Sequence, residues 1–305
     1  MADASPVRSS SKTALGVAAL RAAHQLLDGE PKILRDPISE RLLDADVLQR
    51  LQSNPARIHE PLTMGLRSHV VLRSRYAEDR LQQAALRGGR QFVILGAGFD
   101  TFAYRQPDWA RNLRIYEVDH PATQAEKRER LKSAGIPIPE NLEFVAIDFE
   151  SVALQPGLQT STLDFSQPTF FSCLGVLVYL TPEAANAVFQ LAASFPAGSE
   201  IVFTFSTPPS SLSRDQAENQ AALAELAAGM GERWQTHFDP EKLTRDLRAL
   251  FSTVSFLNSE DAERTYFQGR SDGLHAPRRG GLCAAIVGND VGNEVGTEAG
   301  NPQQK

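Results

Sequence analysis

The sequence predicts an α/β fold built on a mostly parallel sheet that helices cover on both faces. From Gln91 onward, short runs rich in β-branched and aromatic residues alternate with helical stretches. The first of these runs passes directly into a glycine turn, and acidic residues follow each of the first three runs. Strands that alternate with helices predict a parallel sheet, because right-handed crossovers leave the helices on its two faces.

Composition excludes several classes of protein. Of the 305 residues, 42% are hydrophobic and 22% are charged, as in ordinary globular proteins. The formal net charge is -6 with both signs interspersed, so we expect no nucleic acid partner, which would need a clustered basic face. No run approaches the ~18 apolar residues of a membrane span, so we expect no membrane partner. The two cysteines, Cys173 and Cys283, lie in apolar runs, which predicts reduced core residues and a cytoplasmic protein.

We predict one large domain with appendages. The serine-rich start and the polar end lack the apolar periodicity that could offset the entropy of ordering. Between Thr13 and Gly88 the apolar residues recur at helical spacing, and Asp36 followed by Pro37 is typical of a helix start. The predicted divisions are a disordered tail at 1–11, a helical cap at 12–88, a core at 89–287 with a helical insert at about 207–238, and a disordered tail at 288–305.

Seven runs are predicted strands because they are short and rich in β-branched or aromatic residues. Helix start signals separate some of them, most clearly Thr181-Pro182-Glu183 and Asp239-Pro240-Glu241, and an Ala/Leu/Glu-rich helix is predicted from Arg214 to Gly231. The predicted strands are Gln91–Leu95, Arg114–Val118, Glu143–Ile147, Thr169–Leu174, Glu200–Phe205, Thr253–Leu257 and Leu282–Val287.

The sharpest local feature is the run QFVILGAGFD, Gln91 to Asp100, in which a strand enters Gly96-Ala97-Gly98. Glycine allows a tight turn and a close backbone approach to a ligand, at the strand end where open α/β sheets bind cofactors. The alternative is a tight connection between the strand and the next helix that binds no ligand.

A dinucleotide site would need Gly or Ala where this chain has Thr101, and Asp100 would repel a pyrophosphate. That acid suits the ammonium and sulfonium of S-adenosylmethionine, so NAD(P) ranks second.

Two further acids end the next two predicted strands. Asp119 can accept hydrogen bonds from both hydroxyls of a ribose, and its alternative role is that of a helix N-cap before Pro121. Asp148 with Phe149 could bind and flank an adenine. Acids at three successive strand ends favour a nucleoside site over three separate caps.

Together these motifs resemble the leucine carboxyl methyltransferase family, particularly its bacterial S-adenosyl-L-methionine-dependent branch. The resemblance lies in LGAGFDT-x-AYR, EVDHP, a strand-end acid and LGVLVYLTPE, in that order, and covers about Thr13 to Val287. It implies a Rossmann-like class I methyltransferase with a seven-stranded sheet, the last strand antiparallel, and a helical N-terminal cap. It also implies an S-adenosyl-L-methionine-dependent O-methyltransferase acting on a carboxylate or hydroxyl of a small-molecule acceptor.

The resemblance implies cofactor roles for six residues. Gly96 and Gly98 would lie near the methionine part, Asp119 near the ribose, and Asp148 with Phe149 near the adenine. Asp100 is the seventh candidate, on the charge argument given above. Arg73 would pair with the cofactor carboxylate, because a guanidinium binds a carboxylate bidentately. The alternative is that Arg73 forms a surface ion pair with Glu78 or Asp79, and the same alternative applies especially to Arg75.

One residue departs from the family pattern, and no catalytic residue is assigned. Leu174 stands where many members have Glu before Gly175, which we interpret as a subgroup trait. No metal cluster is recognisable, so metal-dependent transfer is not expected. His120, His237 and Tyr179 are candidate bases that an ionised carboxylate acceptor would not require. The rival functions are an NAD(P)-dependent oxidoreductase and a non-catalytic cofactor-binding scaffold.

Overall fold

The computed structural model describes residues 10–149, 153–278 and 280–288, and its centre is a seven-stranded sheet. The strands are β1 (Gln91–Leu95), β2 (Arg114–Asp119), β3 (Leu142–Ala146), β4 (Thr169–Cys173), β5 (Glu200–Phe205), β6 (Thr253–Phe256) and β7 (Gly281–Ile286). Their order across the sheet is β3-β2-β1-β4-β5-β7-β6, and β7 runs antiparallel to both of its neighbours. The remaining pairs are parallel, which confirms the predicted fold.

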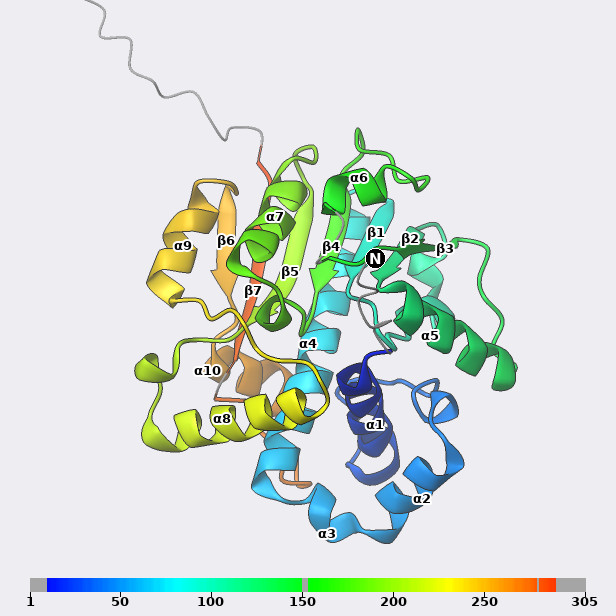
Figure 1. Ribbon diagram of the computed structural model, residues 1–305, viewed down its shortest axis with the longest axis vertical. Coiled ribbons are helices and arrows are strands. Elements are labelled where there is room, and N and C mark those ends of the chain that lie inside the picture. The colour runs from blue at the N-terminus through cyan, green and yellow to red at the C-terminus, as the bar shows by residue number, and fades with distance from the viewer. Residues whose placement is uncertain (1–9, 150–152, 279, 289–305) are drawn as a thin grey trace, which may run out of the picture.

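Helices cover both faces of this sheet (Figure 1). Their bounds are α1 (Lys12–Leu27), α2 (Ala45–Ser53), α3 (Pro55–Ile58), α4 (Pro61–Leu86), α5 (Pro121–Ser133), α6 (Leu154–Leu158), α7 (Pro182–Ala193), α8 (Arg214–Gly229), α9 (Pro240–Arg248) and α10 (Ser259–Ala262). Helices α6, α7 and α9 pack on one face, and α4 and α10 pack on the other. In Figure 1, α1, α2 and α3 lie below the strands, beside the ends from which the loops after β1 and β2 emerge.

The alternation of side chains along β1 explains why two cores form. Val93 and Leu95 belong to the core on one face, whereas Phe92 and Ile94 belong to the core on the other. Successive side chains of a strand point to opposite faces, so a central strand that is apolar throughout needs helices on both. All five residues of β1 are buried, as the sequence predicted for a central strand.

The predicted helix starts are confirmed by capping bonds. Thr181 Oγ1 accepts a hydrogen bond from Ala184 N at 3.2 Å at the start of α7. Asp239 Oδ1 accepts one from Lys242 N at 2.8 Å at the start of α9. Each cap is followed by proline at the first helical position, where a missing N–H has no cost.

The predicted helix start at Asp36-Pro37 is wrong. The chain there forms a turn that leads into a short 3-10 helix, Glu40–Leu42. The Asp36 carboxylate accepts from Ser39 N at 3.1 Å, and it also pairs with Arg21 Nε at 2.9 Å. A buried acid facing an arginine of another element stabilises a compact loop, and local sequence signals do not show that partner.

The predicted tails can be checked only in part, and both cysteines lie where they were predicted. Residues 1–9 and 289–305 of the predicted tails lie outside the described residues, whereas Ser11 is the N-cap of α1. Cys173 and Cys283 are free and buried, as predicted, and burial raises the pKa of the Cys173 thiol to about 12. Within the described residues, no helix is long and apolar enough to cross a bilayer.

Candidate functional site

A cavity of about 1000 Å³ opens at the carboxyl ends of the parallel strands. Its wall is formed by the loops after β1 to β5 together with α1, α4 and α8. That volume is at the upper end of the range for small-molecule sites, so the cavity has room for a nucleoside-sized ligand and a second molecule. All seven of the residues predicted to bind a cofactor line it: Arg73, Gly96, Gly98, Asp100, Asp119, Asp148 and Phe149.

The glycine turn after β1 needs glycine for both its dihedral angles and its contacts. Gly96 and Gly98 have φ of +68° and +48°, in the left-handed region that side chains disfavour. A Cβ on Gly96 would lie 2.3 Å from Val176 Cγ2, and one on Gly98 would lie 3.1 Å from Ala14 Cβ. The turn therefore fits between the loop after β4 and the first turn of α1.

The carboxylate of Asp119 holds this turn from the neighbouring strand end. It accepts hydrogen bonds from Gly98 N at 2.5 Å and from His120 N at 2.6 Å. Burial raises the pKa of Asp119, and these two backbone N–H groups act in the opposite direction. The N-cap of α5 is His120, whose Nδ1 accepts from Ala122 N at 3.2 Å, so the alternative role of Asp119 as that cap is wrong.

Arg73 extends from α4 to the loop after β4. Gly175, with φ of +76°, leaves room for it, since a Cβ there would lie 2.5 Å from Arg73 Nη1. Burial lowers the pKa of Arg73 to about 10, so the guanidinium stays charged at neutral pH. Arg75 pairs with Asp79 at 2.9 Å, whereas Arg73 forms no ion pair or hydrogen bond with any residue that the structure describes. The cavity is thus lined by a cation that pairs with no carboxylate of the described residues.

The other predicted residues lie at the remaining strand ends. Asp100 Oδ1 accepts from Phe102 N at 2.8 Å and so closes the turn after the two glycines. Asp148 and Phe149 line the cavity where the chain leaves β3, and Phe149 also packs against the core under α6 and α7. Leu174, at the position of the family's Glu, is partly buried against the core on the α4 face.

Sequence analysis missed three cavity-lining residues that join the start of α1 to the segment after α8: Ser11, Thr13 and Glu232, which we call the latch. Ser11 Oγ donates to Glu232 Oε1 at 2.7 Å, and Thr13 Oγ1 donates to the other carboxylate oxygen. All three line the cavity. Of the three, only Ser11 had a local signal, as the N-cap of α1. Its bond to Glu232 has no local signal, because the two residues are more than 200 positions apart in the sequence.

The candidate bases differ in position. His120 and Tyr179 line the cavity, and so does His69 of α4, which sequence analysis missed. His237 is exposed and is not part of the cavity wall. Among the residues that the structure describes, no three His, Cys, Asp or Glu side chains are grouped so as to hold a metal ion.

Most of the cap and the first four strands match the sequences of a known protein family. The sequence profile of leucine carboxyl methyltransferases matches residues 14–193, which include every residue predicted to bind a cofactor. The chain belongs to the leucine carboxyl methyltransferase family. This confirms the predicted resemblance.

Several bacterial proteins are curated relatives of this family member. A Bacillus subtilis protein named "Putative S-adenosyl-L-methionine-dependent methyltransferase YktD" is 32% identical over 235 residues, covering 76% of this chain and 77% of the relative. A Mycolicibacterium paratuberculosis protein, "Putative S-adenosyl-L-methionine-dependent methyltransferase", is 30% identical over 237 residues, covering 75% and 73%.

Solved structures share the fold of this family member. A DUF574 family protein from Streptomyces avermitilis superposes with a TM-score of 0.56 at 15% identity, covering 89% of this chain and 97% of that one. A structure described as a "putative methyltransferase" from Thermobifida fusca gives a TM-score of 0.55 at 18% identity, covering 89% and 94%. At these identities the likeness concerns the fold alone.

Proposed function

We propose that this protein is an S-adenosyl-L-methionine-dependent O-methyltransferase that methylates a carboxylate of a small molecule, or else a hydroxyl. Membership of a methyltransferase family supports the enzyme class and the cofactor. The observation that carries the proposal is that all seven predicted cofactor residues, from three strand ends and α4, line one cavity. A nicotinamide oxidoreductase is the poorer fit, because its cofactor's pyrophosphate would face Asp100.

The residues present fit the chemical groups of S-adenosylmethionine. The unpaired guanidinium of Arg73 suits the cofactor carboxylate, and Asp100 suits its ammonium and sulfonium. Asp119 uses one lone pair on each oxygen for a backbone N–H, and a carboxylate has about four acceptor sites, which leaves capacity for ribose hydroxyls. Asp148 and Phe149 remain for the adenine. We propose that residues 12–88 form the cap over this cofactor and that the insert at about 207–238 frames the acceptor.

The chain contributes alignment and exclusion of water. When bound, S-adenosylmethionine supplies a methyl group on a positively charged sulfur, which an acceptor oxygen can take by in-line displacement. The cap, the latch and α8 enclose the cavity and would hold the two reactants within reach of each other. A carboxylate, with a pKa near ~4, is ionised at neutral pH and needs no base. A hydroxyl acceptor would need a general base. His69 of α4 lines the cavity and is a candidate for that role.

The test is a thermal-shift comparison of S-adenosylhomocysteine, NAD and NADP. A ligand that binds only the native state stabilises it by ~2.7 kcal/mol at a hundredfold excess over its dissociation constant. S-adenosylhomocysteine should raise the melting temperature, and NAD and NADP should not. A larger shift with a nicotinamide cofactor would reject the proposal. Incubation with S-adenosylmethionine and pooled carboxylic acids and phenols then distinguishes an enzyme from a non-catalytic scaffold, which would release no S-adenosylhomocysteine.

A further inference from the structure

We infer that the acceptor has an apolar body that lies between α4 and α8, in contact with Leu62 and Leu66 of α4 and with Leu223 and Leu226 of α8. The inference rests on the proposed function and names the acceptor class as apolar carboxylic acids, with the carboxylate directed to the ends of β4 and β5, where the described lining residues include no acid. All four leucines line the cavity.

Away from the ends of β1, β2 and β3, the wall of the cavity offers fewer polar groups to a ligand. Several of its polar groups near β5 are engaged within the protein, and Gln220 Oε1 is a buried acceptor there without a hydrogen-bond partner among the described residues. Thr204 Oγ1 accepts from Gly175 N at 2.6 Å, and Ser206 Oγ accepts from Gln220 Nε2 at 2.5 Å. Gln220 Nε2 also donates to the carbonyl of Thr207 at 3.0 Å, which ties α8 to the end of β5. Few hydrogen bonds are therefore available there to a polar body, which would be desolvated without compensation.

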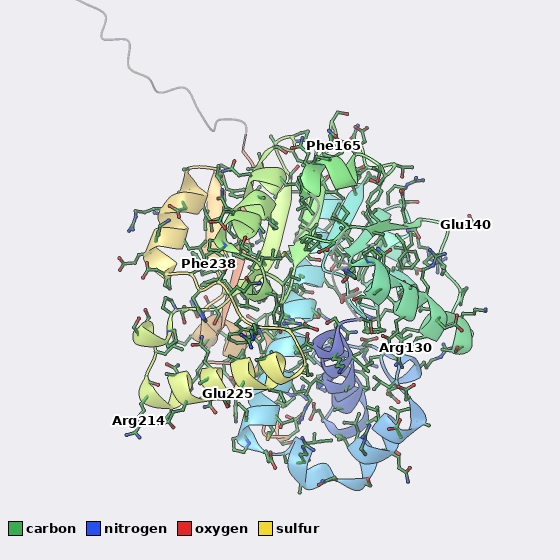
Figure 2. The ribbon with its side chains drawn as sticks, viewed as in Figure 1. Arg130, Glu140, Phe165, Arg214, Glu225 and Phe238 are labelled. Atoms are coloured by element: carbon green, nitrogen blue, oxygen red, sulfur yellow. The ribbon has the colours of Figure 1, made fainter. Side chains whose placement is uncertain are left out.

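Helix α8 carries leucine side chains that are not buried in the protein core. Of its residues only Gln220 and Ala227 are buried. Leu226 is 59% exposed although it lines the cavity. Arg214 at the start of this helix points away from the rest of the molecule (Figure 2), and Glu225 is also exposed. Large exposed apolar side chains at a cavity mark a binding surface, because burying them against a ligand is favourable.

Exposure alone would not support this inference. Leu86, at the end of α4, is 74% exposed and lies outside the cavity wall. It therefore serves as a matched control for Leu226, since both are exposed leucines on helices and the same substitution can be made at each.

The charges around the cavity are compatible with an acid. Asp100, Asp119 and Asp148 lie at the strand ends, and Glu232 is engaged in the latch. On the α3 and α4 side the ionisable lining residues are basic, Arg57 and His69 among them. A carboxylate entering between α4 and α8 would meet no acid on those two helices among the lining residues that the structure describes.

The test uses straight-chain carboxylic acids from butanoate to dodecanoate with S-adenosylmethionine, and it follows release of S-adenosylhomocysteine. Each added methylene that contacts the leucine wall should raise kcat/KM about fourfold, until the wall is filled. Leu226→Ser and Leu223→Ser should flatten this dependence and lower kcat/KM for decanoate about tenfold, with little effect on butanoate. Leu86→Ser should behave as wild type.

Binding of decanoate to the protein loaded with S-adenosylhomocysteine, measured by calorimetry, is the second arm and needs no turnover. A rate independent of chain length, or a Leu226→Ser variant indistinguishable from Leu86→Ser, would overturn the inference. So would failure of decanoate to bind to protein that has bound S-adenosylhomocysteine. Failure of S-adenosylhomocysteine to bind is a separate result and counts against the proposed function itself.

Discussion

The carboxylate of Asp119 at the end of β2 accepts the backbone N–H of Gly98 in the turn after β1, at a distance of 2.5 Å. A side chain proposed to bind the ribose thus also fixes the turn proposed to approach the methionine part. The two halves of the cofactor site are coupled through one carboxylate, and substitutions of Asp119 should affect both.

Asp119→Ala should lower the affinity for S-adenosylhomocysteine on the order of tenfold to several-thousandfold. Hydrogen bonds to a charged group contribute ~1.5 to 3 kcal/mol each, and ~1.4 kcal/mol is a factor of ten. The fold should survive, because the carboxylate is at the cavity and not in a core. Isothermal titration with circular dichroism measures both, and wild-type affinity in a folded variant would contradict the ribose assignment.

Asp119→Asn should resemble Asp119→Ala more than wild type. Both carboxylate oxygens accept backbone N–H groups, from Gly98 and from His120, and an amide has only one oxygen. The amide nitrogen would face one of the two N–H donors. An Asn variant with undiminished affinity would show that the charge and the second acceptor are dispensable.

The affinity for S-adenosylhomocysteine should fall on acidification. The ionised form of Asp119 accepts hydrogen bonds, and burial raises its pKa above that of an ordinary aspartate. Protonation therefore begins at a higher pH than the usual value of about 4, and affinity should be level near neutrality and decline toward pH 5. Calorimetry across that range measures it, and Asp119→Asn should lack this acid limb.

Arg73→Ala should weaken S-adenosylhomocysteine at least about tenfold and leave adenosine nearly unchanged, since adenosine has no carboxylate to lose. Arg75→Ala is the matched control, because Arg75 sits on the same helix and is already paired with Asp79. Equal losses for both ligands in Arg73→Ala would instead assign this arginine to holding the cap in place. A loss confined to Arg75→Ala would transfer the carboxylate role to that residue.

Glu232→Ala should speed dissociation of S-adenosylhomocysteine several-fold, because it removes the acceptor of Ser11 and Thr13 that closes the latch. Glu225→Ala removes an exposed glutamate on α8 outside the cavity wall, and its rate should match that of wild type. Stopped-flow displacement measures both rates. Equal rates in the two variants would mean that the latch does not limit release.

Most of the sheet could be predicted because its signals are local. A central strand is a short, mostly apolar run, so Gln91–Leu95 and Glu200–Phe205 match β1 and β5 at both ends. The other strands differ from prediction by one residue, at one end for β2, β4 and β6 and at both ends for β3 and β7. Six of the seven cofactor residues could be grouped because the carboxyl ends of parallel strands meet at one edge, whereas Arg73 of α4 was assigned from the family resemblance.

The contacts that close the cavity could not be predicted, because they join residues far apart in sequence without a local pattern. Nothing near Gly175 indicates that Arg73 of α4 occupies the space beside it. The same holds for Glu232 and Thr13, and for the ion pair of Asp36 with Arg21 that replaces the expected helix start. Tertiary partners decide such positions, and propensity does not.

Ser10 and Ser11 line the cavity, whereas β7 ends at Ile286 beside the first residue of β5, on the opposite edge of the sheet. This asymmetry bears on how the enzyme should be purified and immobilised. An affinity tag fused directly ahead of Ser10 would be attached at the cavity wall, where it would compete with the reactants. A tag placed after β7 leaves the molecule from the far side. Kinetic measurements should therefore use protein tagged at its C-terminal end, or protein from which an N-terminal tag has been cleaved.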